Sequence, residues 1–179
     1  VAIVGSNAYI GDVQRITSPA DDSDTVSFTP QHDRIIRSAY RQYDIFPEGN
    51  YIDVATDDGD QIVKLVGFSD RLLQFKKNTL YVLNISGDMD FVEAKYRYQG
   101  VKKPYAVCEF EGGVAWVNQN GCYIYDGEQI LNLVDNKIDP NKASSNSALE
   151  TEGWKSFIGE TGMISYVPDL KQFVIFEDP

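Results

Sequence analysis

The sequence contains one histidine and two cysteines, and both shortages exclude kinds of chemistry. A single histidine, His32, cannot build a histidine-rich metal site. No Gly-x-Ser-x-Gly motif accompanies it, which argues against a serine hydrolase. On the strands predicted below, Cys108 and Cys122 lie two strands apart, about 9 to 10 Å, whereas a disulfide spans at most about 7 Å between Cα atoms. We therefore expect two reduced core cysteines and no catalytic residue, metal or cofactor.

Long apolar runs are also missing. A membrane-spanning helix needs roughly 18 to 20 consecutive apolar residues, and no segment approaches that length. The N-terminal Val1–Gly5 lacks the basic region of a signal peptide. We expect no membrane partner. The ends of the chain fall within a repeating strand pattern, so we expect residues 1–179 to be one β-rich region of a larger protein.

Positive charge is in the minority. With 16 Lys and Arg against 27 Asp and Glu, the net charge is −11 and the pI is about 4.4. Such a chain repels nucleic acid and anionic lipid, so sequence-specific nucleic-acid binding is not expected. The acids gather in short clusters where loops are predicted, which favours solvated turns. One cluster, 57–60, has the oxygen density for calcium but lacks the later bidentate Glu of a calcium loop.

The most regular stretch present is Gly112–Gly127, which predicts a tight β-hairpin. Alternation places Val114, Trp116 and Asn118 on one face of the first arm, and residues 122–125 form the returning arm. We predict that Asn120-Gly121 makes the turn, because Asn and Gly tolerate the positive φ of tight hairpins. Asp126-Gly127 predicts a second turn of the same kind.

This hairpin pattern recurs along the chain. Residues 72–84 align without gaps on residues 114–126, 42 positions later, and looser copies begin at Val1 and Met163. A strand-rich unit repeated every 40 to 50 residues is typical of a β-propeller, whose blades are about four strands each. We predict an all-β fold, a partial propeller of two to three blades with one short helix. A β-sandwich with several hairpins is the alternative.

The remaining segments give more local predictions. Residues 148–157 predict the one helix, interrupted by Gly153, with Trp154, Phe157 and Ile158 on its buried side. The polar segment Ser18–Pro30 predicts a surface loop, which places His32 at the edge between that loop and a strand. Residues 57–60 predict a hairpin turn between a strand at 51–55 and another at 62–68.

Two longer stretches carry a family resemblance. They read VKLVGFSDRLLQFKKNTLYVLNIS and YQGVKKPYAVCEFEGGVAWVNQNGCYIYDGEQILNLVDNKI. Their order resembles the head-to-tail joining, stabilisation or nozzle-type tail proteins of short-tailed bacteriophages, and the likeness covers about half the chain, from Ile62 to Ile138. The chain departs from the family pattern in its long Asp-rich segment at 18–30 and at both ends.

The resemblance implies a structural virion protein made in the host cytoplasm. Several members of that group carry β-propellers within six-fold rings around the conduit through which the genome leaves. Its implied partners are identical subunits in a ring, a hexamer in those members, and other virion proteins such as portal, adaptor or tail. An acidic wall fits a channel along which DNA slides. The family has no catalytic motif, so the resemblance implies no active-site residue.

An aromatic cluster gives the candidate contact residues. Tyr96 and Tyr98 alternate onto one face of a predicted strand, and Tyr123 and Tyr125 share a face near Trp116. These five residues are expected either to pack between blades or to contact a partner. The alternative function is a carbohydrate-binding or glycan-cleaving propeller that uses these rings with one or two carboxylates. The candidate acids for that alternative are Asp53, Glu93, Glu109 and Glu111.

Overall fold

The computed structural model describes residues 1–17, 27–56, 58–87, 89–135 and 148–177. Within these residues the chain consists mainly of antiparallel strands, with one α-helix, α1 (Ala148–Ile158), and one short 3-10 helix, η1 (Pro104–Ala106). The all-β class predicted from the sequence is confirmed. No helix in this part of the chain has the length and apolar character needed to span a bilayer.

The described strands form three four-stranded sheets and one hairpin, and every sheet keeps its strands in chain order. The first sheet contains β1 (Ala2–Val4), β2 (Asn7–Thr17), β3 (Ser27–Arg37) and β4 (Tyr51–Asp53). The second contains β5 (Ile62–Phe68), β6 (Arg71–Lys76), β7 (Thr79–Asn84) and β8 (Phe91–Arg97). The third contains β9 (Val107–Phe110), β10 (Gly113–Asn118), β11 (Gly121–Tyr125) and β12 (Ile130–Asn132). The C-terminal hairpin pairs β13 (Met163–Val167) with β14 (Gln172–Phe176).

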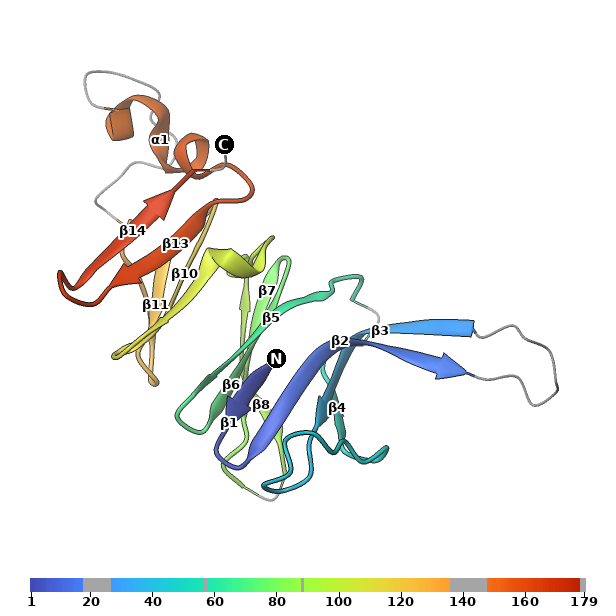
Figure 1. The fold of residues 1–179 in the computed structure, drawn as a ribbon. Coiled ribbons are helices and arrows are strands. Elements are labelled where there is room, and N and C mark those ends of the chain that lie inside the picture. Colours follow the sequence, from blue (N-terminus) through green and yellow to red (C-terminus); the bar gives the residue numbers. More distant parts are fainter. Residues whose placement is uncertain (18–26, 57, 88, 136–147, 178–179) are drawn as a thin grey trace.

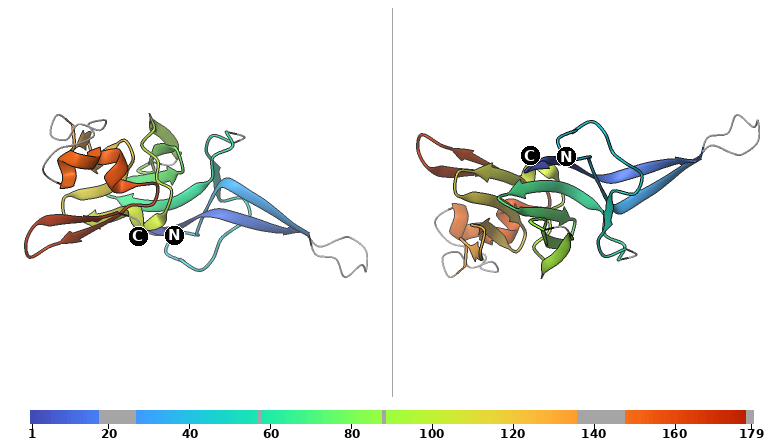
Figure 2. Two further views of the ribbon diagram at one scale, coloured as in Figure 1. Left: turned by 90° about the horizontal axis from the view of Figure 1, so that it is seen from above. Right: turned by 90° about the horizontal axis from the view of Figure 1, so that it is seen from below.

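The sheets stack face to face in chain order (Figure 1). One apolar core joins the first sheet to the second and includes Tyr9, Ile35, Leu72 and Leu83. A larger core joins the second sheet, the third sheet, α1 and the C-terminal hairpin. The described strands make an open stack, with no closed barrel or propeller among them. Beyond the stack, β2 and β3 continue together as a two-stranded arm (Figure 2).

The second sheet is buried on both faces, and this explains why its central strands lack polar alternation. Leu72 faces the first sheet, whereas Leu73 and Phe75 belong to the core shared with the third sheet. Successive strand residues point to opposite faces, so a sheet covered on both sides needs consecutive apolar residues. The run Leu72-Leu73-Gln74-Phe75 in β6 is therefore the sequence signal of this central position.

Neighbouring sheets contact each other along their first two strands. β5 contacts β1, β2 and β10, and β13 contacts β9 and β10. Gly67 in β5 lies so near β1 that a Cβ atom there would stand 2.3 Å from Cγ2 of Val4. Between the second and third sheets, Nζ of Lys64 in β5 donates a hydrogen bond to the carbonyl oxygen of Val107 in β9 at 2.8 Å. Burial lowers the pKa of this ammonium group. The stack is therefore tightest along one edge.

The 42-residue repeat corresponds to equivalent hairpins. Residues 72–84 form β6 and β7, and residues 114–126 cover β10 and β11, the two central strands of successive sheets. Aligned positions face the same way, since Tyr81 packs toward the first sheet and Tyr123, stacked on Trp116, packs toward the second. The copy proposed at Val1 is wrong as an equivalent, because it falls on the first two strands of its sheet, and the copy at Met163 forms a two-stranded sheet among the described residues.

Several local predictions are corrected by the strand pairing. β4 pairs with β3, so residues 58–60 belong to a connection between two sheets and not to a hairpin turn. β3 begins at Ser27, so the end of the predicted loop 18–30 is strand and His32 lies inside β3; residues 18–26 lie outside the described residues. The helix is confirmed, with Gly153 at φ 66° breaking it and Trp154 and Ile158 buried.

The turn of the Gly112–Gly127 hairpin also differs from the prediction. Asn118 pairs with Gly121, so Gln119 and Asn120 form the loop, and neither has a positive φ. Gly121 packs against a neighbouring strand: a Cβ there would lie 2.6 Å from Oδ1 of Asn132 on β12, so that side chain would have to shift. The second predicted turn is confirmed, since Gly127 has a φ of 104°.

Candidate interaction surfaces

Three of the five aromatic residues selected from the sequence are buried in the larger core: Trp116, Tyr123 and Tyr125. Trp116 is 0% exposed, and its ring stacks on Tyr123 at a centroid distance of 5.4 Å. Phe75 from β6 meets Trp116 edge-on at 5.3 Å. The predicted burial of Trp116 and Tyr123 is confirmed. These rings hold two sheets together and offer no surface to a ligand.

Tyr125 and Tyr96 also contribute to packing. Tyr125 is buried, meets Phe68 of β5 edge-on at 6.3 Å, and donates its hydroxyl hydrogen to the carbonyl oxygen of Gly127 at 2.9 Å. Tyr96 on β8 is partly buried against the larger core. Tyr98 differs, because β8 ends at Arg97 and the expected alternation with Tyr96 stops there.

Tyr98 is the one member of the set whose ring is presented to solvent. Its side chain is 72% exposed, and its backbone adopts a φ of 65°, which is uncommon for a bulky residue. The side-chain amides of Asn118 and Asn120 each donate a hydrogen bond to the Tyr98 carbonyl oxygen at 3.0 Å. The β10–β11 turn therefore holds the backbone of Tyr98 in this unusual conformation.

Cationic side chains surround Tyr98. A hollow of about 130 Å³ lies on one side, between the β6–β7 turn and the β10–β11 turn, and includes Lys77, Lys102 and Glu160. A second hollow on the other side includes Lys95 and Arg97, with Asp58 and Asp60 across it. No ion pair is formed by these four cations within the described part of the chain. This grouping of cations could not be predicted from sequence, since the four residues come from three separate segments.

A buried ion cluster links the first two sheets. The side chain of Lys76 is 0% exposed, and its Nζ lies 2.6 Å from Oδ1 of Asp33 and 3.0 Å from Oδ1 of Asp58. It also donates to the carbonyl oxygen of Ala55 at 3.1 Å. Burial alone lowers the pKa of Lys76, but the hydrogen bonds and charges of the two aspartates outweigh it and raise the pKa. Lys76 therefore stays charged and joins the sheets.

The acidic stretch considered for calcium has structural roles. Burial raises the pKa of Asp58, but the hydrogen bond from the Asp60 N–H and the contact with Lys76 give a net lowering. The carboxylate of Asp60 accepts hydrogen bonds from the N–H groups of Lys77 and Asn78 at 2.8 and 2.9 Å, which fixes the β6–β7 turn. Among the described residues, no group of three or more His, Cys, Asp or Glu is suited to hold a metal ion.

The candidate catalytic carboxylates are not brought together in a pair. Asp53 forms a two-pronged ion pair with Arg34 at 2.7 and 2.6 Å, and Glu93 pairs with Arg71. Glu109 lies exposed on β9, and Glu111 lies in the turn that follows. His32 contacts Asp12 at 2.5 Å at the base of the β2–β3 arm.

Both cysteines are free, as predicted. Cys108 on β9 and Cys122 on β11 flank the intervening strand β10. Burial raises the pKa of Cys108 to about 11 and that of Cys122 to about 12, so neither is an activated nucleophile.

In comparisons with known proteins, no family model matches the chain, and no curated protein matches it.

Proposed function

We propose that this chain is a structural component of a bacteriophage tail or neck. In this proposal its sheets are blades of a β-propeller, within a subunit that forms a ring around the genome conduit. The proposal combines the virion-protein resemblance of residues 62–138 with the arrangement of the sheets. Its partners would be identical subunits and neighbouring portal, adaptor or tail proteins, and its location would be the virion after synthesis in the host cytoplasm.

One observation carries the propeller interpretation. Three successive four-stranded sheets, each with its strands in chain order, stack with contacts along their first two strands. Propeller blades have the same strand order, and their inner strands lie closest to the shared axis. A β-sandwich packs two sheets against each other and leaves their outer faces free. Here the second sheet is covered on both faces, which favours blades over a sandwich.

The roles of the polar residues support a structural function. Lys76, Asp33, Asp58 and Asp60 join sheets or fix turns, and Arg34–Asp53 and Arg71–Glu93 tie strands within a sheet. A net charge of −11 suits a conduit wall that must not retain DNA.

The carbohydrate alternative lacks most of the exposed aromatic rings that it requires. It relied on Trp116 and the neighbouring tyrosines as a sugar-binding platform, but Trp116, Tyr123 and Tyr125 are buried. Asp58 and Asp60 lie near the exposed Tyr98, but Asp58 is engaged by Lys76 and Asp60 by two backbone N–H groups, so we do not put this alternative forward.

The proposal is tested by electron microscopy and native mass spectrometry of the full-length protein. We expect rings of identical subunits in which residues 1–177 fit a propeller, and capsid, portal or tail genes beside the coding sequence. A full-length protein that stays monomeric and binds a defined sugar would overturn the proposal.

A further inference from the structure

The two ends of the sheet stack carry opposite charge. In an antiparallel meander, alternate turns lie at opposite ends, so the β5–β6, β9–β10 and β11–β12 turns share one end. The β6–β7 turn, the β10–β11 turn and the connection from β8 to η1 share the other. We call the first the acidic end, made by Asp70, Glu109, Glu111, Asp126 and Glu128. We call the second the basic end, made by Lys77, Lys95, Arg97, Lys102 and Lys103.

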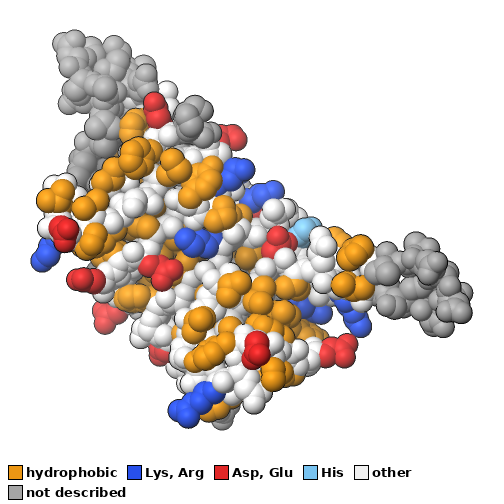
Figure 3. Space-filling model, in the orientation of Figure 1, with side chains coloured by type: hydrophobic (Ala, Val, Ile, Leu, Met, Phe, Trp, Pro, Cys, Tyr) orange, Lys and Arg blue, Asp and Glu red, His pale blue; other side chains and the backbone are white. Residues whose placement is uncertain are grey.

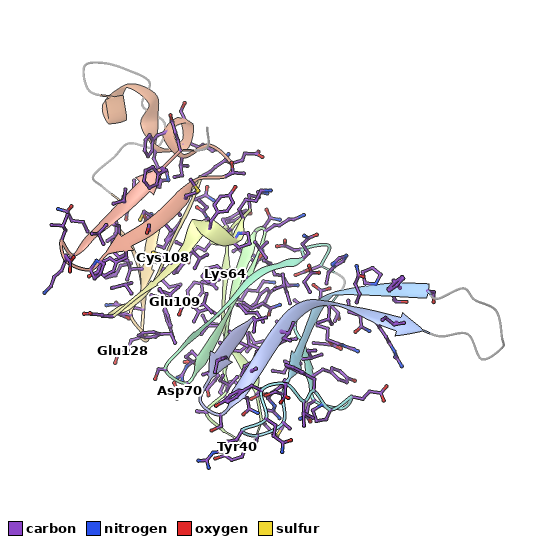
Figure 4. The ribbon with its side chains drawn as sticks, in the orientation of Figure 1. Tyr40, Lys64, Asp70, Cys108, Glu109 and Glu128 are labelled. Atoms are coloured by element: carbon purple, nitrogen blue, oxygen red, sulfur yellow. The ribbon has the colours of Figure 1, made fainter. Side chains whose placement is uncertain are left out.

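The acidic end holds charges that are mostly unpaired. Glu111, Asp126 and Glu128 are exposed turn residues without an ion pair among the described residues, whereas Asp70 is paired with Arg71. Hydrogen bonds from the N–H groups of Gln129 and Glu128 lower the pKa of Asp126. Figure 4 places Asp70, Glu109 and Glu128 along one side of the stack, and Figure 3 shows carboxylates along the same lower-left margin.

The basic end carries five exposed cations, none in an ion pair within the described ranges. Asp58 and Asp60 lie near them, but Asp58 is engaged by Lys76, and Asp60 by two backbone N–H groups. Glu160 is the third acid that borders this end. In Figure 3, blue side chains lie on the upper margin with red ones near them, and further blue side chains lie elsewhere on this face.

Tyr98 stands in the middle of the basic end, between the hollow with Lys77 and Lys102 and the hollow with Lys95 and Arg97. A rigidly held, exposed aromatic residue within a polar rim has the features of an interface anchor.

We propose that the basic end docks onto the acidic end of a second copy of this chain, with Tyr98 as the central anchor. In a chain of net charge −11, the five unpaired cations of the basic end attract the acidic end of another copy. Two basic ends, or two acidic ends, repel each other. The contact is therefore head-to-tail, which joins two different surfaces of the same chain. The inference rests on the charges of the two ends and holds whether or not the chain belongs to a virion.

Nucleic acid is the other polyanion that a basic surface attracts. The −11 net charge and the nearby Asp58, Asp60 and Glu160 oppose a phosphate backbone, whereas a protein surface can place its carboxylates selectively. A second copy is therefore the better occupant.

A charge-swap experiment tests the proposal. The basic-end variant is Lys77→Glu/Lys102→Glu, which lowers the summed charge of the five named cations from +5 to +1, and the acidic-end variant is Glu111→Lys/Glu128→Lys, which changes that of the five named acids from −5 to −1. Sedimentation of the full chain is measured for each variant alone and for an equal mixture. We expect the unmodified chain to self-associate at low salt and to dissociate at about 1 M NaCl, where charges are screened within about 3 Å. Each variant alone should lose at least tenfold in association, and the mixture should recover it.

Matched controls separate docking from general charge effects. Lys155→Glu/Arg15→Glu changes the net charge as much as the basic-end variant but lies on α1 and on the β2–β3 arm, and it should leave association unchanged. Tyr98→Ser should weaken association, whereas Tyr40→Ser, at a similarly exposed tyrosine, should not.

A chain that stays monomeric at low salt, or a mixture of the two variants that fails to associate, would overturn the inference. Binding of a labelled oligonucleotide that is lost in the basic-end variant, with no self-association, would assign the basic end to nucleic acid instead.

Discussion

The Nζ atom of Lys76 on β6 lies 2.6 Å from Oδ1 of Asp33 on β3, so a fully buried ammonium group on the second sheet is neutralised from the first. Asp58, on the connection between these sheets, completes the cluster. The contact spans the apolar core that joins the two sheets, and it makes their relative position depend on one side chain.

Replacing Lys76 by Met should destabilise the fold. The methionine fills similar space but leaves Asp33 and Asp58 without their cation. Removing one partner of a fully buried pair costs about 3 to 5 kcal/mol, and the partly exposed carboxylates reduce this to about 1 to 3 kcal/mol. Urea denaturation gives the value. The exposed neighbour supplies the control, since Lys77→Met should change the free energy of unfolding by less than about 0.5 kcal/mol. Equal losses at both positions would contradict the role of Lys76.

The same cluster should shape the pH dependence of stability. The pKa of Asp58 lies below its ordinary 3.8 in the folded chain, so its contribution is present above pH 3.8 and is lost on acidification through the folded pKa. The pKa of Lys76 lies above its ordinary 10.5, so its contribution is present below pH 10.5 and is lost as the pH rises through the folded pKa. Unfolding measured from pH 2 to 11 should show both losses, and the Lys76→Met profile should be flatter at both extremes. An unchanged profile in that variant would show that other groups control the titration.

Shortening Trp116 should open the core between the second and third sheets. Trp116→Ala removes contacts with Phe75 and Tyr123 and should cost about 3 to 5 kcal/mol, measured by chemical denaturation. Trp116→Phe keeps an aromatic ring and should cost clearly less. The indole Nε1 has no hydrogen-bond partner among the described residues, so the phenylalanine loses no hydrogen bond. A small cost for the alanine variant would mean that the two sheets do not depend on this ring.

Adding one methyl group at Gly67 should force β5 away from β1. Gly67→Ala places a Cβ 2.3 Å from Cγ2 of Val4 and should cost about 1 to 3 kcal/mol through overpacking. Gly49→Ala is the matched control, because a Cβ there meets nothing within 4 Å. A Gly67→Ala/Val4→Ala double variant should recover part of the loss, since the second change makes room. If the costs simply add, the clash with Val4 is not the cause.

Both thiols should be protected from alkylating reagents in the folded chain. With pKa values of about 11 and 12, Cys108 and Cys122 carry roughly one part in a thousand or less of thiolate at pH 8. A colorimetric thiol assay should therefore give slow reaction at pH 8 and complete reaction of both residues in concentrated urea. Rapid modification of Cys122 under native conditions would show that β11 opens readily.

The hairpins and the central core could be predicted because their signals are local. Alternation, turn residues and the 42-residue repeat identify β6–β7 and β10–β11, and they place Trp116 and Tyr123 inside. The partners of each strand could not be read in the same way. Residues 51–53 and 62–68 look like two arms of one hairpin, yet they belong to different sheets because β4 completes the first sheet on β3.

The polar features were less predictable than the apolar ones. Lys76 is the last residue of β6, and nothing in the local sequence pattern distinguishes it from the exposed Lys77. Its partners lie 43 and 18 positions away. Tyr98 was expected to share a face with Tyr96, but Asn118 and Asn120 hold its backbone outside the strand. Both results depend on contacts between distant segments, which alternation does not encode.

The strand order within the sheets bears on how the chain folds during synthesis. Each sheet is complete once its own consecutive residues have emerged, because it uses no strand from a later segment. Pairing between neighbours in the sequence needs only short loop closures, which favours rapid formation. The first sheet can therefore form while the third is still being made, and each finished sheet offers an apolar face on which the next one assembles.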